Sequence, residues 1–119
     1  MGLFSSKKNI EWRHITEMSH LDEIVEASKS KPQLIYKHST RCGVCSMVRN
    51  RLDSEWSHNG RIDPWHLDLL AHRDISNAIA NRFNIRHESP QIIILSNGNA
   101  VVHVSHASLG SRDLDQVAA

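Results

Sequence analysis

Residues 91–96, with the sequence QIIILS, constrain the fold more than any other stretch of the chain. A continuous apolar run of this length is typical of a strand whose two faces are both covered by other elements. Asn97-Gly98 follows it, and this pair is preferred in two-residue hairpin turns because both positions need positive φ. Residues 100–105 then have the composition of a returning antiparallel strand. The sequence therefore predicts a sheet with a buried strand and a hairpin beside it.

Strands and helices alternate along the rest of the chain. Apolar periodicity predicts, in chain order, strand 10–15, helix 20–31, strand 33–39, helix 43–57, strand 64–70, helix 75–83 and, after the hairpin, a short helix at 111–119. Ser19 with Asp22 three residues later approximates a capping box for the first helix, and Pro32 is expected to end it. This order predicts an α/β fold of three α/β/α layers, with a mixed central sheet and helices on both faces.

The length and net charge of the chain limit its domain count and its classes of partner. The chain has 119 residues, which suggests a single domain, expected at 9–119 behind a flexible tail at 1–8. Its 14 basic and 13 acidic residues give a net charge of +1, so neither nucleic acid nor an anionic membrane surface should attract it strongly. No apolar run approaches the ~20 residues of a membrane span, and the N-terminus lacks the pattern of a signal peptide. A cytoplasmic protein is expected.

The two cysteines, Cys42 and Cys45, are three residues apart at the predicted junction of a strand and a helix. The first turn of a helix carries unpaired N–H groups and a partial positive charge, which favour a thiolate. We therefore expect Cys42 to be the attacking thiolate and Cys45, nearer the buried stripe, to be the resolving thiol. Gly43 should leave the access side open, and Arg41 is either a substrate-facing cation or a solvated side chain.

Other interpretations of the cysteine pair remain open. The thiols could be small buried hydrophobic side chains, or remnants in a non-catalytic adaptor. They could also be half of a zinc site, which usually needs four ligands, with His38 and His58 flanking the motif. We expect no metal, because no second pair of cysteines is present. His38 ends the strand before the motif and could instead tune Cys42.

Pro90 comes just before the apolar strand. Proline is poorly tolerated inside a central strand, so Pro90 marks a strand start. An X-Pro bond at such a turn is also a candidate cis peptide.

The stretches IYKHSTRCGVCSM and RHESPQIIIL resemble the YtxJ-type bacilliredoxin-like family, which has the thioredoxin fold. The resemblance extends over about residues 10–110. It implies that Cys42 is the reactive cysteine and that Pro90 is a cis-proline beside it. The backbone of Ser89 would then lie next to Cys42 and could pair with an extended substrate. Arg41, Gly43, Ser89 and Pro90 are therefore the expected substrate-binding residues.

Two positions depart from that family. Gly43 stands where Pro is common and Cys45 where Ser is common, so a two-thiol route becomes possible. The resemblance implies a thiol–disulfide oxidoreductase acting on oxidised or thiolated proteins. Its co-substrate would be a low-molecular-weight thiol, with bacillithiol as the leading candidate, and a small thiol or a disulfide reductase would supply electrons. We expect no bound cofactor and a monomer.

Overall fold

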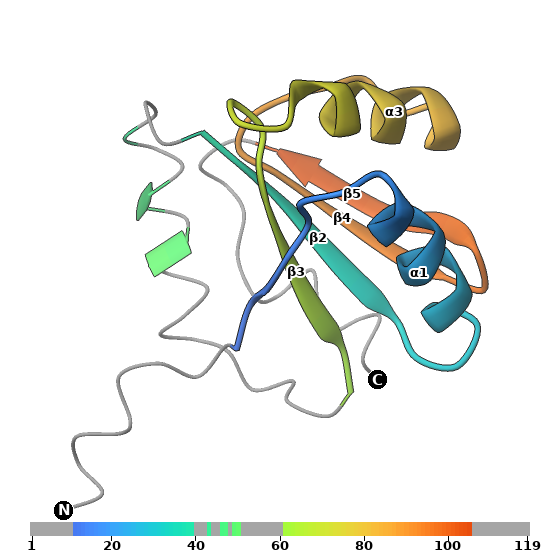
Figure 1. The fold of residues 1–119 in the computed structure, drawn as a ribbon. Helices are drawn as coiled ribbons and strands as arrows, with labels where there is room; N and C mark the ends of the chain where they lie inside the picture. Colours follow the sequence, from blue (N-terminus) through green and yellow to red (C-terminus); the bar gives the residue numbers. More distant parts are fainter. Residues whose placement is uncertain (1–10, 40–42, 44–45, 48, 51–60, 106–119) are drawn as a thin grey trace, which may run out of the picture.

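A computed structural model describes residues 11–39, 43, 46–47, 49–50 and 61–105 (Figure 1). The predicted tail at 1–8 and the predicted helix at 111–119 lie outside the described residues. Of the predicted helix at 43–57, the described residues Gly43, Ser46–Met47 and Arg49–Asn50 are helical.

The centre of the fold is a mixed five-stranded sheet, as predicted. Its order across the sheet is β1 (Arg13–His14), β3 (Asp63–Asp68), β2 (Gln33–His38), β4 (Gln91–Ser96) and β5 (Asn99–Ser105). Strands β1, β3 and β2 are parallel, whereas β4 runs antiparallel to both β2 and β5. The first strand is shorter than predicted, because only Arg13 and His14 pair with β3.

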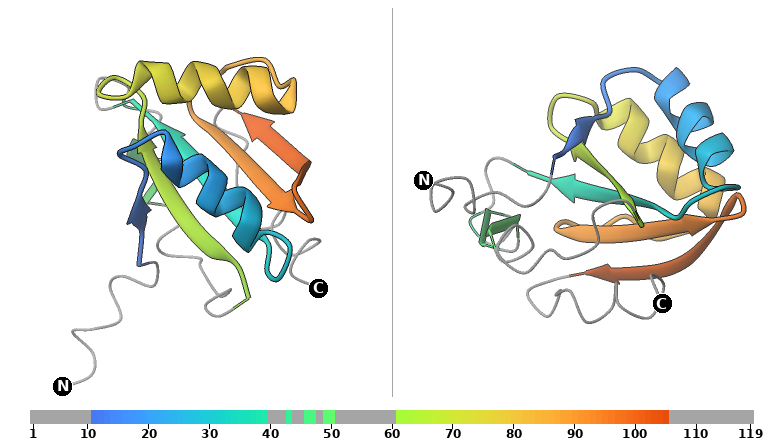
Figure 2. Two further views of the ribbon diagram at one scale, coloured as in Figure 1. Left: turned by 45° about the vertical axis from the view of Figure 1, so that its right-hand side comes forward. Right: turned by 90° about the horizontal axis from the view of Figure 1, so that it is seen from below.

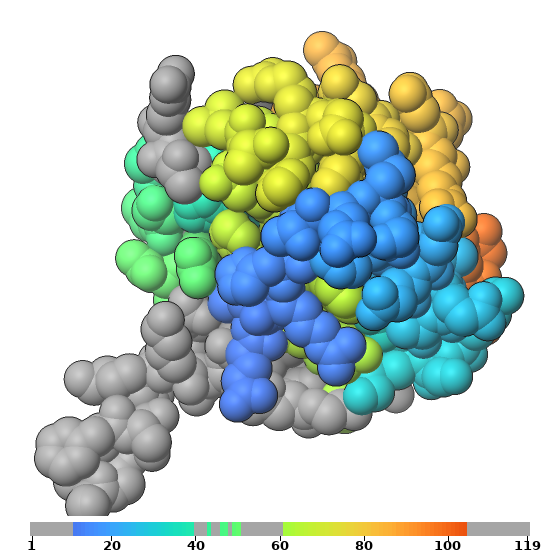
Figure 3. All heavy atoms as spheres, in the orientation of Figure 1, coloured from blue at the N-terminus to red at the C-terminus, as the bar shows by residue number. Residues whose placement is uncertain are grey.

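Helices α1 (Ser19–Ala27) and α3 (Arg73–Phe83) pack on the same face of this sheet (Figure 2). Seen as spheres, the two helices lie side by side and hide most of the strands beneath them (Figure 3). In Figure 2 the described helical residues of 43–50 lie on the opposite face, where the Arg49 guanidinium sits 6.0 Å from the ring of Trp12. Described helical residues are therefore found on both faces of the sheet, as expected.

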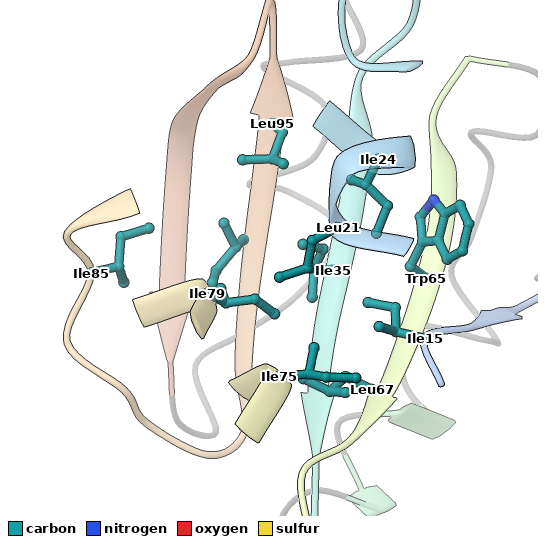
Figure 4. Packing of buried hydrophobic residues seen from close by; sticks show 11 residues of the cluster. Ile15, Leu21, Ile24, Ile35, Trp65, Leu67, Ile75, Ile79, Ile85 and Leu95 are labelled. Atoms are coloured by element: carbon teal, nitrogen blue, oxygen red, sulfur yellow. The ribbon is translucent and has the colours of Figure 1, made fainter. Parts of the chain in front are cut away.

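Two hydrophobic clusters sit on the two faces of the sheet. The cluster under α1 and α3 contains Ile15, Leu21, Ile24, Ile35, Trp65, Leu67, Ile75, Ile79, Ile85, Ile93 and Leu95 (Figure 4). The cluster on the other face contains Leu34, Tyr36, Ile62, Ile92 and Ile94. Strand β2 is buried along its whole length and β4 at all residues except the last, which confirms that the apolar strand 91–96 is covered on both faces.

The ends of α1 differ from the prediction. The capping box is wrong, because Met18 is the N-cap and makes no side-chain cap hydrogen bond, while Ser19 Oγ donates to Glu17 Oε1. Nδ1 of His20 instead accepts hydrogen bonds from the backbone N–H groups of Thr16 and Glu17, at 3.0 and 3.3 Å. The helix therefore begins with a histidine folded back onto the preceding turn.

The helix also ends earlier than predicted, at Ala27 rather than just before Pro32. Ser28 Oγ donates to the carbonyl of Val25 at 2.6 Å and accepts from Gly98 N–H at 2.8 Å, and the Ser28 carbonyl accepts from Asn97 N–H at 2.8 Å. Asn97 and Gly98 have φ of 53° and 79°, which confirms the predicted turn. The hairpin turn, distant in sequence, thus fixes where α1 stops.

The described residues contain no helix long and apolar enough to cross a membrane.

Candidate functional site

The candidate site lies around the C-terminal end of β2. This strand is the middle one of the sheet and ends at His38, four residues before Cys42. Arg41, Cys42 and Cys45 lie outside the described residues, so their predicted roles stay predictions. Gly43 is described and exposed, and an ideal Cβ built on it would meet no heavy atom of the described chain within 4 Å.

The loop before β4 reaches the same end of the sheet. The Ser89–Pro90 peptide bond is cis, and β4 begins immediately afterwards at Gln91, both as expected. Gln91 pairs with Lys37, and continuing this register by one residue places Pro90 opposite His38. The structure therefore brings together the end of the strand that precedes Cys42 and the cis-proline, which are about fifty residues apart in sequence.

Aromatic rings surround His38 on this face. His38 is 5% exposed, and its ring centroid lies 5.0 Å from that of His66 on β3 and 5.7 Å from that of Tyr36. His66 is 8% exposed and also contacts Trp12 and His14, with centroid distances of 5.9 and 5.6 Å. The neighbouring strands thus build a compact aromatic patch that contains two buried imidazoles.

Both buried imidazoles are held in the neutral form. Burial lowers the pKa of His38, the Arg49 charge lowers it further, and Asp68 partly offsets these effects. The pKa of His66 falls to about 4, chiefly because of burial, with the positive charge of Arg49 adding to it. At neutral pH each ring therefore carries one proton, with one nitrogen able to donate and one able to accept.

One nitrogen on each ring is buried without a hydrogen-bond partner among the described residues: Nδ1 of His38 and Nε2 of His66. Leaving a buried polar atom unpaired costs about 1–3 kcal/mol, so native proteins rarely tolerate it without a reason. A neutral imidazole with an unused nitrogen can take or give a proton close to a reacting group. This property makes His38 and His66 candidates for proton chemistry at the C-terminal end of β2 and β3.

The sequence reasoning missed His66 and Lys37. Both are polar residues inside strands that are otherwise mostly apolar, and this was the available signal. Lys37 is completely buried on the face of the sheet opposite His38. Its pKa is lowered to about 8 by burial.

Within the described part of the chain, no group of three or more His, Cys, Asp or Glu side chains is arranged to hold a metal ion. The zinc alternative rests on Cys42 and Cys45, which lie outside the described residues.

Comparisons with known proteins agree with this architecture. The model of a family described as monothiol bacilliredoxin BrxC matches residues 13–114. Among solved structures, a candidate oxidoreductase with a thioredoxin fold superposes with a TM-score of 0.75 at 24% identity, covering 87% of this chain and 89% of the other. A thioredoxin from Malassezia sympodialis gives 0.72 at 15% identity, covering 93% and 90%. A thioredoxin from Fasciola hepatica gives 0.68 at 13% identity, covering 89% and 95%.

These structural relatives show the fold, and the family match spans most of the chain. The similarity to bacilliredoxins that the sequence suggested is thereby confirmed. This chain belongs to the monothiol bacilliredoxin family and has the thioredoxin fold.

Proposed function

We propose that this chain is a thiol–disulfide oxidoreductase that removes a low-molecular-weight thiol from thiolated proteins. The observation that carries the proposal is the meeting of β2 with the Ser89–Pro90 loop. The strand that leads to Cys42 ends opposite a cis-proline, in a chain whose family is described as monothiol bacilliredoxin. Bacillithiol is the small thiol that the family description favours.

In the first step the Cys42 thiolate attacks the small-thiol sulfur of a mixed disulfide between that thiol and a cysteine of the substrate protein. A disulfide forms between Cys42 and the small thiol, the original disulfide breaks, and the protein cysteine leaves as a thiolate that takes up a proton. The substrate cysteine is thereby reduced and Cys42 oxidised. No bound metal or cofactor is needed for this exchange.

Two routes can restore Cys42. In the dithiol route, Cys45 attacks Cys42, expels the small thiol and leaves a 42–45 disulfide that a disulfide reductase must reduce. In the monothiol route, a second small thiol attacks the sulfur of the first one in the mixed disulfide. The two small thiols leave as a symmetric disulfide, and Cys42 is released as a thiolate. The family description names the monothiol route, whereas the presence of Cys45 favours the dithiol route, which we propose here.

The proposed substrate contacts are Arg41, Gly43, Ser89 and Pro90. An extended segment of the substrate would lie along the backbone of Ser89, at the end of the sheet where β2 and β4 meet. The open position of Gly43 supports access from this side. Because the reaction depends on reduced thiols, we place it in the cytoplasm, with thiolated proteins as partners.

We also propose that His38 tunes Cys42. His38 is close in sequence to the thiol and is held neutral with Nδ1 unused among the described residues. A neutral imidazole with its proton on Nδ1 can donate a hydrogen bond to the Cys42 thiolate, which stabilises the anion and lowers the thiol pKa. The buried ring of His66 would hold His38 in place.

The test is to incubate three proteins with a bacillithiolated substrate protein and follow intact masses. Wild type should release the substrate and form a 42–45 disulfide, which lowers its mass by two hydrogens. Cys45→Ser should accumulate one bacillithiol on Cys42, and Cys42→Ser should do neither. If wild type accumulates the mixed disulfide as Cys45→Ser does, the route is monothiol. If neither wild type nor Cys45→Ser accepts or removes the thiol, the proposed function is wrong.

A further inference from the structure

Lys37 is a lysine inside the protein core. It is the next-to-last residue of β2, it is 0% exposed, and it is among the largest fully buried side chains of the described chain. Lysine is almost never fully buried unless its charge is paired. Its Nζ lies 3.2 Å from the carbonyl oxygen of Ser76 in α3 and 3.2 Å from Nδ1 of His87, and neither of these partners is a carboxylate.

These contacts join three parts of the fold. Lys37 belongs to β2, Ser76 to the first turns of α3, and His87 to the loop that leads to Pro90. Ser76 also contacts His87 directly, because its Oγ lies 3.3 Å from the same Nδ1. The loop is thus tied to the sheet and to the helix through a single imidazole nitrogen.

The geometry determines the protonation state of His87. A lysine ammonium can only donate hydrogen bonds, so Nδ1 of His87 must carry no proton in order to accept one, and its ring proton must be on Nε2. Partial burial, together with the charges of Lys37 and Arg73, lowers the pKa of His87, while Glu88 opposes this. The neutral ring that the contact requires is therefore the form present at neutral pH.

The loop has other anchors on either side of His87. The Ile85 N–H donates to the carbonyl of Ala80 at 3.0 Å, and the Ile85 side chain is buried in the core. Nε2 of Gln91 donates to the carbonyl of Arg86 at 3.0 Å. The side chain of His87 adds a further attachment, directly before Glu88 and Ser89.

We propose that Lys37 and His87 are positioning residues that hold loop 86–89 against the end of β2, in the arrangement that receives the substrate. Protonation of His87 breaks this tie, which is the contact between Lys37 Nζ and His87 Nδ1. The assignment of substrate to this loop rests on the proposed function, whereas the tie itself does not.

Protonation of His87 removes the acceptor that Lys37 uses. A protonated His87 has donors on both ring nitrogens and can no longer accept from Lys37. It would also place a second positive charge beside a buried ammonium, near Arg73, with Glu88 as the opposing charge. Like charges at this distance repel strongly where water is partly excluded. We therefore expect the loop to be ordered above the His87 midpoint and released below it.

Three variants separate the parts of this proposal. Lys37→Met keeps the length and shape of the side chain but removes the donor. His87→Asn keeps an acceptor, because Oδ1 is attached to the same carbon as Nδ1 of histidine, and this acceptor cannot be protonated. Ser76→Ala is the matched control, because it removes only Oγ and leaves the carbonyl that Lys37 contacts.

The first measurement needs no enzymatic activity. ¹⁵N relaxation gives backbone order parameters for residues 86–89, and a titration of the imidazole signal gives the midpoint of His87. Above that midpoint, we expect order parameters of about 0.85 in wild type and below about 0.6 in Lys37→Met. Below it, wild type should become as mobile as Lys37→Met, while His87→Asn stays ordered. A loop equally ordered in wild type and Lys37→Met, or one in wild type that does not respond to His87 protonation, would overturn the tie.

The second measurement is the kinetics of removal of the small thiol from a thiolated peptide. Lys37→Met should raise KM by roughly tenfold with kcat nearly unchanged. The single variant His87→Asn should keep the wild-type KM, because it keeps the acceptor. Ser76→Ala should stay within about threefold of wild type. If Lys37→Met makes loop 86–89 mobile but leaves KM unchanged, the role of the loop in substrate binding is wrong, although the tie between Lys37 and His87 exists. If wild type shows no turnover, the proposed function fails and the relaxation data still decide whether the tie exists.

Discussion

The imidazole rings of His38 and His66 lie side by side on two neighbouring parallel strands, with their centroids 5.0 Å apart. Both rings are buried, and each has a nitrogen without a hydrogen-bond partner among the described residues. The pair can remain neutral only while the pH stays above the pKa values of the folded state. Because the unfolded state takes up a proton at the His66 position near pH 6.5, acid should begin to lower the stability of the folded patch well above the folded pKa of about 4.

His66 should make the protein sensitive to mild acid. Its pKa is about 4 in the folded protein and about 6.5 when unfolded, so the unfolded state binds the proton first. This contribution to stability is complete above about pH 6.5 and is lost as the pH falls to about 4, by up to about 3 kcal/mol. In His66→Phe, urea unfolding should show a flatter decline in unfolding free energy over this range.

The matched control for that experiment is His103→Phe, which replaces an exposed histidine on β5. It should keep the wild-type slope between about pH 6.5 and 4. If His66→Phe and wild type lose stability in parallel, the buried neutral state of His66 is wrong.

His38 should affect the reactivity of Cys42. The cleanest background is Cys45→Ser, where iodoacetamide can modify only one thiol. We expect His38→Phe to raise the apparent pKa of Cys42, measured from the pH dependence of the alkylation rate, by about one unit. The phenyl ring keeps the aromatic packing against Tyr36 and removes the nitrogens. An unchanged alkylation profile would contradict the tuning role of His38.

Lys37 should make the protein more stable in alkali. Its folded pKa of about 8 is below the unfolded value of 10.5, so the folded state releases its proton first as pH rises. The free energy of unfolding should therefore gain up to about 3 kcal/mol relative to Lys37→Met between about pH 8 and 10.5. Other groups titrate equally in both proteins, so the difference isolates Lys37. A difference that stays constant across this range would show that the ammonium is not destabilised by burial.

Gln33 should be one of the most sensitive polar positions in the sheet. It is fully buried, its Oε1 accepts from Trp65 Nε1 at 2.9 Å, and its Nε2 donates to Asp63 Oδ2 at 2.8 Å and to the Lys31 carbonyl at 3.0 Å. Gln33→Leu leaves the indole N–H unpaired in the core. We expect a loss of about 2–4 kcal/mol in unfolding free energy, measured by urea titration.

Lys31→Ala provides the comparison for Gln33. It removes the ion pair with the same Asp63 carboxylate, at 3.3 Å, but the Lys31 side chain is 39% exposed whereas Gln33 is fully buried. Its cost should be below about 1 kcal/mol. Similar losses in the two variants would mean that the bonds of Gln33 contribute no more than a surface ion pair.

Much of the fold could be predicted because its signals are local. The apolar run at 91–96 requires a strand covered on both faces, and Asn97-Gly98 supplies the positive φ values of its turn without reference to any other segment. The strand that ends at His38 likewise follows from the pattern of neighbouring residues. The cis peptide at Pro90 was expected for a different reason, since composition alone left it as a candidate and the family resemblance favoured it.

Contacts between distant segments decided the rest. Helix α1 ends at Ala27 because Ser28 is hydrogen-bonded to the hairpin turn about seventy residues later. The apolar periodicity of residues 20–31 does not indicate that contact. Similarly, Lys37 and His87 are fifty residues apart, and only the packing of β2, α3 and the loop before Pro90 makes them partners. The sequence by itself determined which segments are strands, helices and turns, since periodicity and backbone preference act over a few residues. Tertiary structure decided which polar groups are buried and what they face, because burial depends on every segment that packs around them.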